Sequence, residues 1–154
     1  SSYGYDFRVD RSYRVYRGGA SQLLDPKSAH EDLFEEVQAD SCALAPGSFL
    51  LAQSVEYFRI PRNILTLCVG KSTYARCGVL VNVTPFEPEW EGYATLSISN
   101  TGPSPVKVYS GEGIAQLIFL EADQICQISY ADRKGKYQAQ KGIVHAQVQS
   151  GEKR

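Results

Sequence analysis

Methionine, histidine and paired cysteines are scarce or absent in this sequence. Its 154 residues include no Met, two His and four Cys, and no C-x-x-C pair occurs. This argues against a zinc site, and the H-x-E and P-C-x-x-C signature of zinc-dependent nucleobase deaminases is missing. We expect reduced, mostly buried thiols. Because the sequence has no Met, we also expect the natural chain to start before Ser1.

The sequence also lacks a long apolar run and a strong net charge. No segment approaches the roughly 18 apolar residues of a membrane-spanning helix, and no signal-like segment is found at the N-terminus. The net charge of −1 gives no reason to expect nucleic acid or an anionic membrane as a partner. The length suits a single domain, residues 1–154, and we expect a cytoplasmic protein.

Helical periodicity is scarce, whereas short alternating segments are common. Only Ala29–Val37 resembles a short helix. Candidate strands are Tyr5–Val9, Tyr13–Tyr16, Phe49–Arg59, Ile64–Val69, Gly78–Val83, Tyr93–Ser99, Val106–Tyr109, Ile114–Leu120 and Ile125–Tyr130. The pattern predicts an all-β fold of the jelly-roll or barrel type. By composition alone, the polar segment 131–154 resembles a frayed terminus.

The segment GYATLSISN, residues 92–100, alternates like a strand but carries no charge. One face would hold Tyr93, Thr95, Ser97 and Ser99, and the other face would be mainly apolar. The hydroxyl-rich face is either a solvated surface or the lining of a site. The residues of this strand alone leave both interpretations open.

Two loops contain residues suited to ligand binding. In GKSTYARCG, residues 70–78, two cations, two hydroxyls and backbone amides could bind an anion, but a Walker A loop would need Gly in place of Leu65. In TPFEPEWEG, residues 84–92, two prolines fix a loop with three glutamates around the only Trp. A solvated turn and a Trp-anchored surface loop are the alternative interpretations.

Five motifs follow one another along the chain: SSYGYDFR, VEYFRIPRNIL, GKSTYARCGVLVNVTPFEPEWEG, SNTGPSPVKVYSGEGIAQLIF and DRKGKYQAQKG. In this order and spacing they resemble the dCTP deaminase family, within the dUTPase superfamily. The resemblance implies a distorted, dUTPase-like β-clip jelly-roll with at most one or two short helices, assembled as a homotrimer with active sites between subunits. It also implies dCTP-, dUTP- or dTTP-type nucleotides as ligands, with Mg²⁺ bound through the triphosphate.

The same resemblance implies roles for individual residues. Ser72, Arg76 and Ser97 would occupy catalytic positions, and residues 131–154 would form a lid over the phosphates. The implied nucleotide contacts are Lys71, Ser72, Thr73, Tyr74, Ala75, Arg76, Glu87, Thr95, Leu96, Ser97, Gln116, Tyr130, Lys136 and Gln140.

Position 97 departs from the family pattern, because Ser97 stands where the family has a glutamate. That glutamate is the general base that activates water for attack on cytosine C4. Losing general acid–base catalysis typically lowers the rate about 100- to 10,000-fold. Three hypotheses follow. The first is a dCTP deaminase whose activity is weak, rescued by a carboxylate such as Glu87 or Glu89, or removed by substitution at Ser97. The second is a dUTPase-like triphosphate hydrolase that uses Glu87, and the third is a non-catalytic, nucleotide-binding regulatory trimer.

Overall fold

Nine β-strands carry the fold in residues 2–28 and 30–147, the parts of the chain that this computed structural model describes. The strands are β1 (Gly4–Tyr16), β2 (Phe34–Gln38), β3 (Ser41–Leu44), β4 (Phe49–Arg59), β5 (Ile64–Gly70), β6 (Val79–Asn82), β7 (Glu91–Asn100), β8 (Val106–Tyr109) and β9 (Gly113–Glu121). The same residues include a 3-10 turn, η1 (Glu31–Leu33), and a one-turn helix, α1 (Ser72–Ala75). The predicted all-β class is confirmed.

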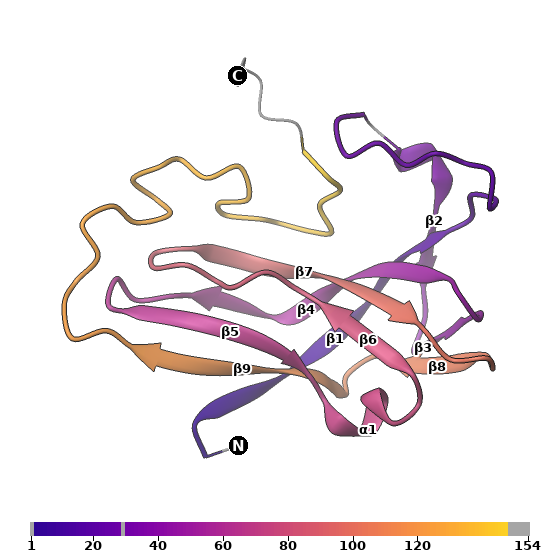
Figure 1. Cartoon of the computed structure of the whole chain (residues 1–154), viewed down its shortest axis with the longest axis horizontal. Coiled ribbons are helices and arrows are strands. Elements are labelled where there is room, and N and C mark those ends of the chain that lie inside the picture. Colours follow the sequence, from indigo (N-terminus) through magenta and orange to yellow (C-terminus); the bar gives the residue numbers. More distant parts are fainter. Residues whose placement is uncertain (1, 29, 148–154) are drawn as a thin grey trace.

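Most strands belong to one antiparallel sheet that curls on itself (Figure 1). Its order is β5-β9-β1-β4-β7-β6, and β2 pairs with the second half of β1. The end strands β5 and β6 contact each other, so the two edges of the sheet approach one another. β3 and β8 form a separate two-stranded sheet. This nearly closed arrangement agrees with the predicted jelly-roll or barrel.

β1 is long because its two halves belong to different parts of the sheet. Residues 4–8 pair with β9, whereas residues 9–15 pair with β4, and the register shifts in both pairings. The sequence predicted two strands, Tyr5–Val9 and Tyr13–Tyr16, and this division is wrong. The polar residues between them do not end the strand, because an irregularity in the pairing bends it instead.

The helix predicted over Ala29–Val37 is also wrong. The turn η1 is followed directly by β2, which pairs along its whole length with β1, from Phe34 opposite Tyr16 to Gln38 opposite Ser12. This long-range pairing overrides a weak local helical pattern. Residue 29 lies outside the described residues.

The segment Ile125–Tyr130 forms no strand, which contradicts the sequence prediction. The carbonyl groups of Cys126 and Gln127 accept hydrogen bonds from the Arg62 guanidinium, at 3.3 and 3.1 Å. These main-chain acceptors therefore have a side-chain donor in place of a neighbouring strand.

Buried side chains fill the space inside the curled sheet, and β7 contributes every second residue to this core. Leu96 and Ile98 are fully buried. Asn100 is also buried, and its Nδ2 donates hydrogen bonds to the carbonyl groups of Leu44 (2.9 Å) and Ser104 (2.8 Å), so the burial of the amide is compensated. The alternate residues of β7 face outward.

Candidate functional site

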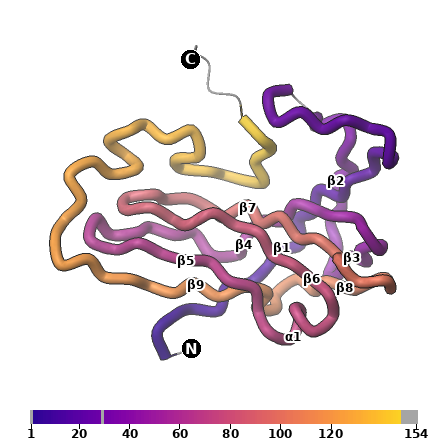
Figure 2. Tube along the Cα trace, viewed as in Figure 1, coloured from indigo at the N-terminus to yellow at the C-terminus, as the bar shows by residue number. Residues whose placement is uncertain are grey.

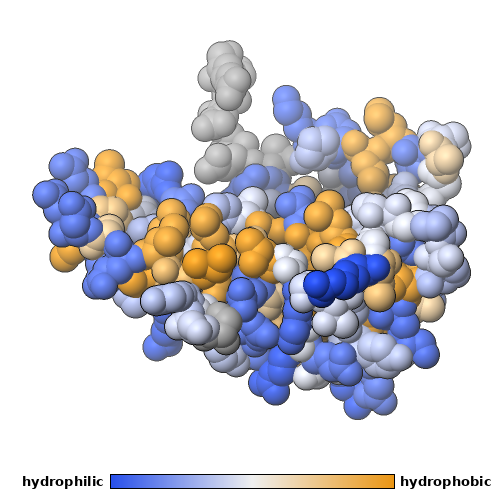
Figure 3. All heavy atoms as spheres, turned by 60° about the horizontal axis from the view of Figure 1, so that its bottom comes forward, coloured by the Kyte–Doolittle hydropathy of each residue, from blue (hydrophilic) through white to orange (hydrophobic). Residues whose placement is uncertain are grey.

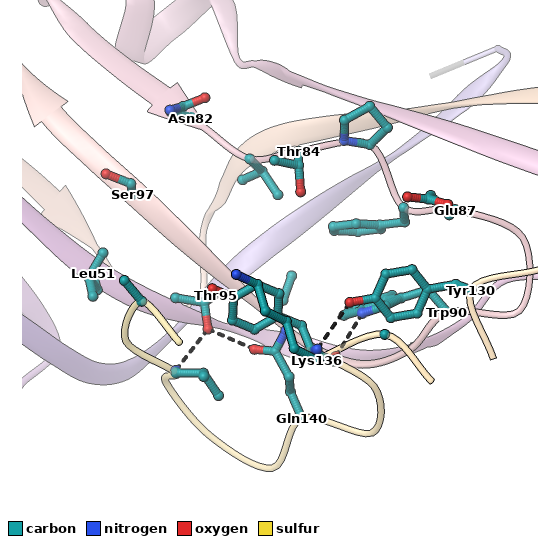
Figure 4. Close-up of a pocket in the computed structure, with 18 of the residues that line it drawn as sticks. Leu51, Asn82, Thr84, Glu87, Trp90, Thr95, Ser97, Tyr130, Lys136 and Gln140 are labelled. Atoms are coloured by element: carbon teal, nitrogen blue, oxygen red, sulfur yellow. Dashed lines mark hydrogen bonds between the residues drawn. The ribbon is translucent and has the colours of Figure 1, made fainter. Parts of the chain in front are cut away.

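A cavity of about 840 Å³ lies between the outer face of β7 and the C-terminal tail, residues 131–147 (Figure 4). Volumes of roughly 300–1,000 Å³ are typical of small-molecule sites. We call Leu51, Asn82, Thr95 and Ser97 the floor of this cavity. The loop 84–90 forms one wall, and the tail folds back alongside β7 to cover the floor (Figure 2). Residues 148–154 of the predicted lid lie outside the described residues.

Strand register brings the floor side chains together. Ser97 lies opposite Leu51 of β4 and Asn82 of β6, and Thr95 lies opposite Gln53 of β4. Cross-strand neighbours on one face have Cβ atoms about 4.5–5.5 Å apart, so Ser97 stands between an apolar side chain and an amide. The tail half-buries this face, where an unpaired charge would be costly. Ser97, at the position where the family has a glutamate, is therefore half-buried beneath the tail.

Main-chain contacts bind the tail to β7. Tyr93 N donates to Gln140 O at 3.1 Å, and Ala139 N donates to Glu91 O at 2.9 Å. Gly92 pairs with Gln140 and has a φ of 144°, and a Cβ atom at position 92 would lie 2.8 Å from Gln140 N. The close approach of the tail therefore requires glycine at this position.

Side chains of the floor and the loop also bind the tail. Thr95 Oγ1 donates to Gln140 Oε1 at 3.1 Å and accepts a hydrogen bond from Val144 N at 3.1 Å. Trp90 Nε1 donates to Tyr137 O at 2.9 Å. Two predicted site residues, Thr95 and Gln140, are thus in direct contact.

Charged groups in the cavity come from the loop and the tail. Glu87 pairs with Arg133, which partly neutralises both. Lys136 is exposed, and its Nζ donates to Gln147 O at 2.8 Å. Figure 4 shows Glu87 and Ser97 at opposite ends of the cavity. The floor around Ser97 is therefore uncharged, whereas the opposite end has both signs of charge.

A second group of predicted residues surrounds α1. Lys71 Nζ pairs with Asp6 at 3.0 Å, and Gln116 Nε2 donates to Asp6 Oδ1 at 2.8 Å. The hydrogen bonds from Gln116 and then Lys71 hold the pKa of Asp6 below its usual value. Tyr74 is buried, and its hydroxyl accepts a hydrogen bond from Tyr109 N at 3.2 Å, so this side chain has a structural role.

The predicted site residues thus fall into two groups. Those that line the cavity are Glu87, Thr95, Ser97, Tyr130, Lys136 and Gln140. Leu96 lies between two of them with its side chain in the core. The second group, which we call the α1 group, consists of Lys71, Ser72, Thr73, Tyr74, Ala75, Arg76 and Gln116. Its members do not line the cavity, and Ser72 and Arg76 are exposed.

Sequence reasoning missed three residues that shape these groups. Asn82 ends the alternating segment VLVN, but its position beside Ser97 depends on the pairing of β6 with β7. Asp6 occurs in the motif SSYGYDFR and Arg133 in the motif DRKGKYQAQKG. Their place in these motifs was the sign in the sequence that they could belong to a site. Their roles became visible only through contacts with distant residues.

Among residues 2–28 and 30–147, no group of three or more His, Cys, Asp or Glu side chains is suited to holding a metal ion. The cysteines are free thiols, and burial raises the pKa of Cys68 to about 12. Cys42 is buried but Cys77 is exposed, so the prediction of mostly buried thiols is correct only in part. No helix of the described chain is long and apolar enough to cross a membrane.

Two solved structures define the class of fold. The crystal structure of 2′-deoxycytidine 5′-triphosphate deaminase from Agrobacterium tumefaciens matches with a TM-score of 0.60 and 16% identity, over 75% of this chain and 38% of that chain. The native EIAV dUTPase matches with a TM-score of 0.50 and 21% identity, over 66% of this chain and 86% of that chain. The chain therefore has the all-β fold that these two proteins share.

Sequence comparison defines the family. A model of the dCTP deaminase-like family matches residues 1–122. The chain is 63% identical to the dCTP deaminase of Chlamydia abortus over 143 residues, which are 93% of this chain and 75% of that protein. It is 61% identical to the dCTP deaminase of Acidobacterium capsulatum over 144 residues, 94% of this chain and 79% of that protein. The chain belongs to the dCTP deaminase-like family.

Proposed function

We propose that the cavity binds dCTP and that its reaction is the hydrolysis of dCTP to dUTP and ammonia, in the cytoplasm. The observation that carries this proposal is the location of Ser97. The family resemblance assigns the general base to this position, and the Ser97 side chain stands on the cavity floor beneath the tail (Figure 4). Related dUTP- or dTTP-type nucleotides are further candidate ligands.

In this reaction, water attacks C4 of the cytosine ring and the exocyclic amino group leaves as ammonia. A base at position 97 would take a proton from the water and return it to the leaving nitrogen. Neither the Ser97 hydroxyl nor its cross-strand neighbours Leu51 and Asn82 can accept this proton near neutral pH. We therefore expect slow turnover by the chain with Ser97.

The two nearby glutamates are poor substitutes for the missing base. Glu87 lines the cavity, but it pairs with Arg133 and lies at the opposite end from Ser97 (Figure 4). Glu89 is not among the lining residues, and it pairs with Arg62 at 2.7 Å. The oxygens of each carboxylate are already engaged by a guanidinium, so neither is free to approach a water molecule beside Ser97. These contacts weigh against rescue by either residue.

The proposed assembly is a homotrimer in which a neighbouring subunit brings its α1 group to the cavity. Its support is that Ser72 and Arg76 are exposed and that an apolar band crosses one face of the single chain (Figure 3). Exposed large apolar side chains on β5, β6 and β9 are Leu65, Leu67, Val69, Leu80, Phe119 and Leu120. Patches of this kind mark protein interfaces, and a heterologous interface that closes gives a ring.

Mg²⁺ would enter the proposed site with the nucleotide. The carboxylate of Glu87 is paired with Arg133, so the lining residues are not arranged as a dedicated metal site. A hard cation held mainly by triphosphate oxygens and water does not need one. When bound, the metal neutralises part of the triphosphate charge, and Lys136 can supply a further positive charge from the tail.

The test compares the chain with its Ser97→Glu variant, by following ammonia and dUTP formation from dCTP with Mg²⁺. The introduced carboxylate would supply the missing general base, and Asn82, opposite it on β6, can orient it by donating a hydrogen bond. We therefore expect deamination to increase about 100-fold or more. Activity should fall at acidic pH with one ionisation, because the base acts in its ionised form. Ser99→Glu is the matched control, since Ser99 faces outward on the same strand but does not line the cavity.

Other outcomes would favour the alternatives. Tight dCTP binding without turnover in Ser97→Glu would support the non-catalytic regulatory trimer. Pyrophosphate release from dUTP or dCTP without ammonia would support the dUTPase-like hydrolase that uses Glu87. Rapid deamination by the unmodified chain would contradict the limiting role of Ser97.

Co-expression tests whether the site is shared between subunits. The double variant Ser97→Glu with Arg76→Ala has the base but lacks the Arg76 guanidinium, and the unmodified chain has the reverse combination. If neighbouring subunits contribute the two groups, mixed assemblies should contain complete sites and deaminate dCTP faster than either protein alone. No gain on mixing, with Ser97→Glu alone active, would place both groups in one subunit.

A further inference from the structure

Arg62 joins three segments of the chain that are distant in sequence. It lies in the turn between β4 and β5, and its side chain is 33% exposed. Nη1 donates to Glu89 Oε2 at 2.7 Å, and Nη2 donates to Asp132 Oδ2 at 2.7 Å. The same guanidinium reaches the carbonyl groups of Cys126 and Gln127. Its planar set of donors thus ties the loop 84–90 to the segment that leads into the tail.

The Arg62 contacts lie next to residues that line the cavity. Asp132 is followed by Arg133, which pairs with Glu87. Two residues before Asp132, Tyr130 N donates to Pro88 O at 3.0 Å. Glu87, Pro88, Tyr130 and Arg133 all line the cavity, whereas Arg62 does not. The guanidinium therefore holds the wall formed by the loop 84–90 in place from outside the cavity.

Asp132 is held in its ionised form at this junction. Its Oδ2 also accepts a hydrogen bond from Ser129 N at 3.0 Å, and Ser129 Oγ accepts one from Asp132 N at 3.2 Å. The hydrogen bond from the Ser129 main chain, followed by that from Arg62, lowers the pKa of Asp132. Without the guanidinium, the carboxylates of Asp132 and Glu89 would repel each other across the junction.

We infer that Arg62 is a positioning residue that holds the tail over the cavity and thereby strengthens nucleotide binding without touching the nucleotide. The inference rests on the proposed function for the identity of the ligand. Loss of the guanidinium removes donors from four acceptors and leaves two like charges unpaired. The start of the tail should then separate from the loop 84–90, while the sheet keeps its structure.

Hydrogen exchange without nucleotide tests the positioning role directly. In Arg62→Gln, we expect faster exchange in peptides that cover residues 128–140, with unchanged exchange in peptides from β4. Arg62→Lys should give an intermediate result, because an ammonium group keeps the charge but not the planar set of donors. Arg62→Gln combined with Asp132→Asn should exchange more slowly than Arg62→Gln alone, because the repulsion between carboxylates is removed.

Arg59→Gln is the matched control. Arg59 ends β4, and its Nε pairs with Glu91 at 3.3 Å, but its side chain is 79% exposed and makes a single ion pair. Exchange over residues 128–140 should be nearly normal in this variant. Equal acceleration in Arg59→Gln and Arg62→Gln would overturn the inference, as would normal exchange in Arg62→Gln.

Calorimetry with dCTP and Mg²⁺ then measures the effect on the ligand. We expect Arg62→Gln to weaken binding roughly tenfold, and the double variant to recover part of the loss. If the unmodified chain does not bind dCTP, the proposed function fails, but the exchange data still test whether Arg62 holds the tail in place. If the tail opens in Arg62→Gln but dCTP affinity is unchanged, the link from the tail to ligand binding is wrong.

Discussion

The cavity lies between two regions of opposite character, β7 and the tail (residues 131–147). β7 is hydrogen-bonded to β4 on one side and β6 on the other, and alternate residues are buried in the core. No residue of the tail is buried, and isolated hydrogen bonds and ion pairs, from main chain and side chains, attach it to β7 and to the loop 84–90. The floor therefore belongs to the cooperative fold, whereas the tail can open without global unfolding.

This difference separates the geometry of the floor from the access and affinity of a ligand. In the proposed site, the floor would fix the position of residue 97, because moving Ser97 would require β7 to lose its pairing with both neighbours. In the proposed site, the tail would control access and affinity, because a ligand beneath it would be held only while the tail is closed. Substitutions in the floor core should alter the free energy of unfolding, and substitutions at the tail contacts should alter local exchange and ligand affinity.

Leu96→Ala should have the largest effect on stability. The Leu96 side chain is fully buried beneath the floor, and truncation of a buried leucine leaves a cavity. We expect a loss of about 2–5 kcal/mol in the free energy of unfolding, measured by urea denaturation.

Val144→Ala provides the comparison in the tail, where Val144 is only half-buried. The urea midpoint should change little, and exchange should increase in the tail peptides alone. If Val144→Ala lowered the global stability as much as Leu96→Ala, the tail would be part of the cooperative fold and the comparison would fail.

The floor was largely predictable from the sequence because strand alternation is a local property. The bounds of β4 and β8 were predicted correctly, and the outward and inward faces of β7 were assigned from alternation alone. Pairing was not predictable, so Asn82 was not recognised as the neighbour of Ser97.

The tail was predictable only from the family resemblance, since its composition resembles a frayed terminus. Its contacts join residues far apart in sequence, such as Trp90 with Tyr137 and Arg62 with Asp132. No local periodicity marks such contacts, and the strand predicted over Ile125–Tyr130 was wrong for the same reason. The α1 group shows a further limit of the sequence. The resemblance assigns its residues to the same site as Ser97, but in the single chain they do not line the cavity.

Thr95→Val should have a smaller effect, confined to the tail. The substitution keeps the shape of the side chain but removes its hydrogen bonds to Gln140 Oε1 and Val144 N. We expect a cost of about 1 kcal/mol for tail closure, seen as faster exchange of the Val144 amide. Ser99→Ala, on the same face of β7, should leave this exchange unchanged. Normal exchange in Thr95→Val would show that main-chain contacts alone close the tail.

The smallest expected effect is a pH dependence of tail closure through His145. The imidazole packs edge-on against Phe34, with ring centroids 4.8 Å apart, and partial burial lowers the pKa of His145 below its usual value. Nearby Glu31 opposes this shift, and Arg14 adds to it. Because the closed tail favours the neutral ring, closure is complete above the unperturbed pKa of about 6.5 and weakens as the pH falls through the lowered value. Tail exchange, corrected for its intrinsic pH dependence, should therefore increase from about pH 7.5 to about pH 5.5, and His145→Gln should abolish the increase. The same increase in His145→Gln would assign the pH dependence to another group.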